Sequence, residues 1–165
     1  MRTFAIALLA ILAVAATPAR VQAQGADLFK GVTTAKPAWD VTVGDEKKFN
    51  DRMDLIRQTA ESLQKRGIKP DFVVLIRGPA TKFVTKTLDK TNFEKDKDKI
   101  KNMSGAQATL KKLKDTGVPV EVCAVAMGVQ KVDKDNVQPF ITVADNVWEN
   151  LIILQNKGYA YMPID

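Results

Sequence analysis

The only cysteine in this chain, Cys123, is the residue whose chemistry most constrains what the protein can do. It lies near the end of the apolar run 118–124, where a buried strand is expected to give way to a turn. A thiol in that position is either a packed core side chain or a sulfur nucleophile. A lone cysteine cannot form an internal disulfide, so a fold held together by disulfide bridges is excluded.

Most other reactive arrangements are excluded by composition. The chain has no histidine, which removes histidine-dependent acid–base catalysis, Ser-His-Asp and Cys-His arrangements, and metal sites that need imidazole. One cysteine also rules out thiolate metal clusters and CxxC redox pairs. Neither GxGxxG nor GxxxxGK[ST] occurs, so the common phosphate-binding loops are missing. We therefore expect no metal site and no cofactor.

A loop after the second apolar run is the next candidate for a functional site. Arg77, Gly78 and Thr81 follow the run 72–76, and ligands of open α/β sheets gather at the carboxyl ends of the strands. There Arg77 could bind an anion, and Gly78 would allow a close approach of the backbone. The alternative is an ordinary strand-to-helix turn with Pro79 at the first helical position.

The residues after Cys123 supply the remaining candidates. A turn or helix beginning near Gly128 would direct free backbone N–H groups at the sulfur and favour the thiolate. Lys131 and Lys82 are cations that could lie near it. If Cys123 is reactive, it is the catalytic residue, with ligand-binding roles for Gly128 and Lys131 beside those of the earlier loop. The alternative is that Cys123 is a packed core side chain.

The elements that must position these residues alternate between strands and helices. Apolar runs predict strands at 39–43, 72–76, 118–124, 140–143 and 159–162. Helical spacing of apolar residues predicts helices at 46–66, 80–88, around 106–113, and at 146–157. Such alternation implies right-handed crossovers and a mostly parallel sheet of about five strands, covered on both faces. The charged stretch 89–102 is expected to be a mobile loop or a frayed helix.

The first 23 residues have the pattern of a secretory signal peptide. Arg2 precedes the apolar stretch 4–16, and Val21 and Ala23 occupy positions −3 and −1 of a cut after residue 23. The stretch is shorter than the about 20 residues of a transmembrane helix, although an uncleaved membrane anchor is the alternative. We expect a periplasmic or secreted protein without membrane attachment, an extended lead-in at 24–38, and one domain at 39–165.

The charge distribution argues against a nucleic-acid partner. The formal net charge is +6, but the lysines are spread along the chain, and in 95–101 they alternate with acidic residues. Alternation of this kind is typical of a solvated surface. Clustered basic residues with interleaved aromatic ones, which nucleic-acid binding favours, do not occur.

Two segments of the sequence resemble the DsrE/DsrF-like family. Residues 117–127 read GVPVEVCAVAM, and residues 150–163 read NLIILQNKGYAYMP. The family often shows a strand that ends in a cysteine, a pair of small residues and a methionine, and later a helix that finishes with Leu-x-x-Gln-x-x-Gly-Tyr-x-Tyr and a proline. Its second strand commonly ends with a residue and a glycine, matched here by Arg77 and Gly78.

The resemblance extends from Trp39 to the end of the chain and implies both a fold and a chemistry. It implies a three-layer α/β/α sandwich with a parallel sheet, assembled as a homo-oligomer, most often a trimer. It also implies a link to sulfur metabolism, because cytoplasmic relatives pass sulfur as a cysteine persulfide, and the matching cysteine is Cys123. The family's frequent asparagine two positions after the cysteine is Val125 here, so one polar group that would orient the sulfur is absent.

We interpret the chain as an exported DsrE-like protein that handles sulfur. Cys123 would accept a sulfane sulfur from a donor protein and pass it to an acceptor. The protein would then be a sulfur carrier rather than an enzyme with catalytic turnover. The alternative is a non-catalytic module that binds a small anion or a protein through Arg77 and Lys131, with a structural cysteine. A thiol-dependent transferase or reductase is disfavoured, because the chain offers no histidine base and no resolving thiol.

Overall fold

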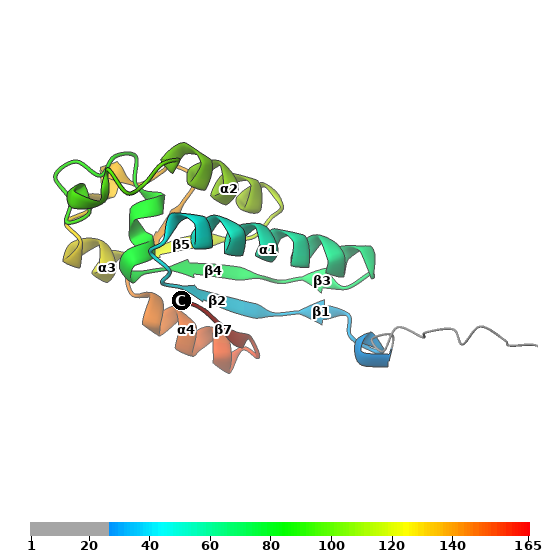
Figure 1. Ribbon diagram of the computed structural model, residues 1–165. Coiled ribbons are helices and arrows are strands. Elements are labelled where there is room, and N and C mark those ends of the chain that lie inside the picture. Colours follow the sequence, from blue (N-terminus) through cyan, green and yellow to red (C-terminus); the bar gives the residue numbers. More distant parts are fainter. Residues whose placement is uncertain (1–26) are drawn as a thin grey trace, which may run out of the picture. The chain divides into compact units, whose positions relative to one another are not determined.

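Five parallel strands form the sheet that positions Cys123 and Arg77. In the computed structural model, which describes residues 27–165, they run in the order β6–β5–β4–β2–β7. Their bounds are β2 Pro37–Val41, β4 Val73–Ile76, β5 Val120–Cys123, β6 Thr142–Ala144 and β7 Ala160–Ile164. A two-stranded parallel pair, β1 Thr34–Ala35 and β3 Lys69–Pro70, continues the line of β2 and β4 toward their N-terminal ends (Figure 1). The predicted signal peptide at 1–23 lies outside the described residues.

Helices cover both faces of this sheet, as the sequence predicts (Figure 1). Those on one face are α1 Glu46–Lys65 and α2 Met103–Asp115, and α4 Val147–Asn156 lies on the other. The short helix α3 Ala124–Val129 follows β5 directly. The described residues also contain four 3₁₀ segments, η1 Asp27–Phe29, η2 Gly78–Val84, η3 Glu94–Asp96 and η4 Lys134–Asn136. None of the described helices is long and apolar enough to cross a membrane.

The chain from Val32 to Asp165 packs as one unit, separate from a unit that ends at Gly31. Its larger core lies between the sheet and α1 with α2, where Phe49 stacks on Phe83 at 4.3 Å between ring centroids. Its smaller core lies under α4 and consists of Ala38, Val73, Leu75, Cys123, Val147 and Leu151. Cys123 therefore belongs to the α4 side of the sheet.

Local chemistry explains why α1 forms where the sequence predicts it. The side chain of Asp45 accepts a hydrogen bond from the backbone N–H of Lys48, at 2.7 Å, and so caps the first turn. Phe49, Met53, Ile56 and Ala60 recur at helical spacing and are buried. The helix ends just before Gly67, whose φ of +75° belongs to the left-handed region that glycine adopts at low cost.

Some boundaries differ from those expected from the sequence. The first sheet strand is Pro37–Val41 rather than 39–43, so the expected lead-in already contains β1 and the start of β2. The expected helix at 80–88 is the 3₁₀ segment η2, which ends at Val84. η2 packs tightly against the loop before α1, because a Cβ on Gly44 would lie 2.7 Å from the Cβ of Pro79.

The charged stretch 89–102 has two anchors that its composition does not reveal. Phe93 is buried in the larger core. Asp96 accepts a hydrogen bond from the Nζ of Lys82 at 2.7 Å, and this bond lowers the pKa of the Asp96 carboxyl. The Lys82 ammonium also lies over the rings of Phe83 and Phe93, at 5.9 and 5.3 Å from their centroids. Lys82 is therefore engaged with this stretch.

Candidate functional site

Cys123 is the last residue of β5 and the N-cap residue of α3. It is free and only 2% exposed, and its neighbours in the smaller core are aliphatic. Reaction of a thiol with a donor or a reagent requires access to the sulfur. In this conformation the α4 residues Val147 and Leu151 pack in the same cluster as Cys123, so the sulfur is covered.

Arg77 forms the strongest polar contact on the same side of the sheet. Its Nε donates to Oδ1 of Asp40 at 2.8 Å, and its Nη2 donates to Oδ2 at 2.7 Å. Asp40 is 2% exposed, and Tyr161 also donates its hydroxyl to Oδ2, at 2.8 Å. The bonds to Asp40 raise the pKa of the Arg77 guanidinium and that of the Tyr161 phenol. A buried carboxylate is thus shared by two donors.

A pocket of about 310 Å³ opens beside this network. The guanidinium carbon of Arg77 lies 4.8 Å from the ring centroid of Trp148, a cation–π contact. The other lining residues are Asp40, Leu151, Ile152, Gln155 and Tyr161. Because Asp40 already neutralises Arg77, the pocket offers aromatic and aliphatic walls with little free positive charge.

Strand register relates this pocket to Cys123. Ile76 pairs with Val122, and Arg77 and Cys123 are the residues that follow them. Side chains alternate between the faces of a sheet, so Arg77 and Cys123 both point to the α4 face. Leu151 belongs to the cluster of Cys123 and also lines the pocket. The expectation that the loop of Arg77 and Cys123 lie at the same edge of the sheet agrees with this arrangement, and the register adds that both side chains lie on one face.

The other residues expected near Arg77 have different surroundings. Gly78 has φ +57°, and no atom lies within 4 Å of a Cβ built there, so glycine serves backbone conformation rather than a close approach. Thr81 is fully buried, and its hydroxyl has no hydrogen-bond partner among the described residues. Neither residue lines the pocket beside Arg77.

The residues expected after Cys123 do not line that pocket either. Gly128 lies inside α3, is exposed, and has open space where a Cβ would be. Lys131 has φ +54° and lines a different hollow of about 480 Å³, whose other charged residues include Lys86 and Asp133. Because that hollow mixes acidic and basic groups, it has no marked preference for an anion.

Asp40, Tyr161 and Trp148 are the residues that sequence reasoning missed. Asp40 is a single charge between Trp39 and Val41 in an otherwise apolar strand, and this signal indicates a buried carboxylate in need of a partner. Nothing in the sequence assigns that partner, because Tyr161 follows 121 residues later. Among residues 27–165, no group of three or more histidine, cysteine or acidic residues is placed to hold a metal ion.

Comparison with known proteins agrees with this architecture. The model of the DsrE/DsrF-like family matches residues 41–164. An uncharacterized protein of Aquifex aeolicus (strain VF5) is 35% identical over 136 residues, which make up 82% of this chain and 59% of that protein. A structure of a protein of unknown function, MTH1491 from Methanobacterium thermoautotrophicum, has a TM-score of 0.60 at 12% identity and covers 78% of this chain and 98% of its own.

The chain therefore belongs to the DsrE/DsrF-like family, which is associated with sulfur relay. Its α/β fold with a parallel five-stranded sheet is similar to that of MTH1491. The chain spans about three fifths of the length of its Aquifex relative.

The network around Asp40 should contribute measurably to stability. We expect Asp40→Ala to lower the free energy of unfolding by about 3 kcal/mol, because it leaves the half-buried Arg77 without its partner. Tyr161→Phe removes one hydrogen bond and should cost about 1 kcal/mol. Urea unfolding measures both. In the control Asp51→Ala, which loses an exposed pair with Lys47, the cost should be about 0.5 kcal/mol or less. Equal costs for all three variants would contradict a special role of Asp40.

Proposed function

We propose that the protein is a sulfur carrier of the DsrE type, in which Cys123 holds a sulfane sulfur. The observation that carries the proposal is the common position of Cys123 and Arg77 on the α4 face, at the carboxyl ends of neighbouring strands. Family membership supports the chemistry. Arg77 is held by Asp40 through Nε and Nη2, so Nη1 is the guanidinium nitrogen that is not bonded to Asp40.

The transfer needs no cofactor and no net oxidation. The Cys123 thiolate attacks the outer sulfur of a donor persulfide, the donor S–S bond breaks, and the donor leaves as a thiol after taking up a proton. Cys123 then carries the persulfide. Attack by an acceptor thiolate on the outer sulfur reverses these roles and restores the Cys123 thiol.

Burial of Cys123 sets a condition on this function. With only 2% exposure, the sulfur is reached only when the covering side chains move. Val147 begins α4 immediately after the Asn146 cap, and Leu151 lies one turn further along. Displacement of this first part of α4 is the smallest movement that would expose the thiol, and local openings of this kind cost less than global unfolding. Such a gate would also protect a bound persulfide from solvent.

A second function is favoured by the same burial. If α4 does not open, Cys123 is a small hydrophobic side chain of the core. The protein would then be a non-catalytic module that binds a partner beside Trp148 and Ile152, which are 60% and 58% exposed. The neutralised Arg77 makes a protein partner a better match for this surface than a small anion.

We also propose that the chain is exported and that it forms a homo-oligomer through α4, with a trimer as the state that the family resemblance implies. The pattern of the first 23 residues supports export. Val147 and Leu151 are buried on the inner side of α4, whereas Trp148, Ile152 and Ile153 are exposed on its outside. An exposed group of large apolar side chains of this kind often marks an interface, and a second copy of the chain would cover it.

The sulfur-carrier proposal predicts the uptake of one sulfur atom. After incubation of the native protein with inorganic polysulfide, the intact mass should rise by one sulfur, and a thiol reductant should reverse the gain. Cys123→Ser should gain none, with little change in its melting temperature. The carrier function would be contradicted if the native protein takes up no sulfur although Cys123 is alkylated in urea. That result would favour the binding module.

Assembly through α4 predicts that a charge introduced on the exposed side of α4 weakens association, whereas a charge on α1 does not. Ile152→Glu should lower the oligomeric state measured by light scattering, because association would bury an unpaired carboxylate. Leu55→Glu on α1 is a matched control, because Leu55 is 48% exposed and lies on the opposite helical layer. A wild-type monomer at micromolar concentration, or equal effects of the two variants, would contradict the proposed interface.

A further inference from the structure

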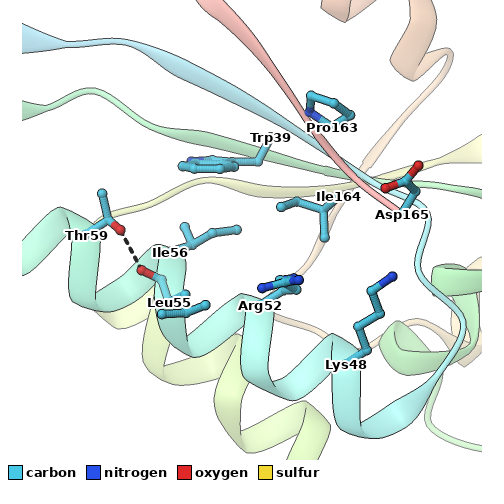
Figure 2. A pocket seen from close by; sticks show the side chains of 9 residues that line it. All are labelled: Trp39, Lys48, Arg52, Leu55, Ile56, Thr59, Pro163, Ile164 and Asp165. Atoms are coloured by element: carbon cyan, nitrogen blue, oxygen red, sulfur yellow. Dashed lines mark hydrogen bonds between the residues drawn. The ribbon is translucent and has the colours of Figure 1, made fainter.

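A crevice of about 440 Å³ lies on the face of the sheet opposite to Cys123 (Figure 2). Trp39 on β2 and Ile164 on β7 form its sheet side, and Leu55 and Ile56 on α1 form its helix side. β7 is the edge strand, paired only with β2. Alternate residues of β7 bond to β2, and Pro163 lies between two of them, on the outer side of the strand. Because proline has no backbone N–H, it cannot donate a hydrogen bond to a further strand there. The crevice therefore suits a small ligand better than an added strand.

One end of the crevice carries positive charge that no acidic residue neutralises by a direct contact. Lys48 and Arg52 lie four residues apart on α1, on the same side of the helix, and both line the crevice. Neither forms an ion pair within residues 27–165, whereas Lys47 one residue earlier pairs with Asp51 at 2.7 Å. Asp165 also lines the crevice, so the three side chains together carry a formal charge of +1.

Trp39 contributes apolar ring surface to the wall. Its indole Nε1 has no hydrogen-bond partner among the described residues, but this atom is buried, so a ligand in the crevice does not reach it. The hydroxyl of Thr59, by contrast, already donates to the backbone oxygen of Leu55 at 2.7 Å.

From the apolar walls and the two cations without an ion-pair partner in the described part of the chain, we propose that the crevice binds an amphipathic monocarboxylate. The apolar chain lies between Trp39 and Leu55, and the carboxylate lies beside Lys48 and Arg52. Asp165 at the same rim would repel a doubly charged group such as a phosphate monoester more strongly than a singly charged carboxylate. Cys123 takes no part in this site, because its side chain lies on the α4 face.

Tryptophan fluorescence tests the proposal directly. The chain has two tryptophans, so the variant Trp148→Phe leaves Trp39 as the only reporter. Octanoate should change the Trp39 emission in a saturable way, whereas octanol, with the same chain length and no charge, should bind at least about fivefold more weakly. Arg52→Gln and Lys48→Gln in the same background should each weaken octanoate binding by about fivefold. Lys47→Gln is the matched control and should leave it unchanged.

The results distinguish a failure of the charged part of the site from a failure of the whole site. Equal affinity for octanoate and octanol would overturn the charged part of the proposal and leave an unselective apolar crevice. The absence of a saturable response, or equal effects of Lys47→Gln and Arg52→Gln, would overturn the site. Circular dichroism of each variant shows whether it is folded, and sulfur uptake at Cys123 is unaffected by any of these results.

Discussion

The arrangement of the α4 face depends on one buried carboxylate. Asp40 is 2% exposed on β2, and an unpaired charge in that position would cost several kcal/mol. Its partners are Arg77, the residue that follows β4, and Tyr161 on β7. Both must keep their register with β2 for the bonds to form. The two hydrogen bonds to Asp40 also hold the Arg77 guanidinium on the α4 side of the sheet, where it contacts the ring of Trp148.

This constraint links the polar network to the thiol. α4 covers Cys123 with Val147 and Leu151, and its neighbouring residue Trp148 contacts Arg77. A movement of the first two turns of α4 would therefore change the surroundings of the network and of the sulfur together. The outer side of the same helix exposes Trp148, Ile152 and Ile153, so a partner bound there would also act on this movement. Burial of Cys123 and exposure of Ile152 are two consequences of one helix position.

Local patterns in the sequence predict the elements well, and long-range pairing explains what they miss. The uninterrupted apolar run 72–76 predicts a strand buried on both faces, and Val73–Ile76 is such a strand. Cys123 ends a strand, as expected. The partners of Asp40 lie 37 and 121 residues away, so no local pattern identifies them. The burial of Cys123 also depends on the path of α4, which crosses the sheet between its two edge strands.

The most direct test of this account is the rate at which native Cys123 reacts with a thiol reagent at increasing urea concentration. A gate formed by α4 predicts labelling that hardly depends on urea below the unfolding transition, because a local opening exposes little surface. Val147→Ala should accelerate it, whereas Leu110→Ala in the other core should not, when both are measured under strongly native conditions. A labelling rate that rises with urea as steeply as global unfolding would contradict the gate and make Cys123 a structural residue.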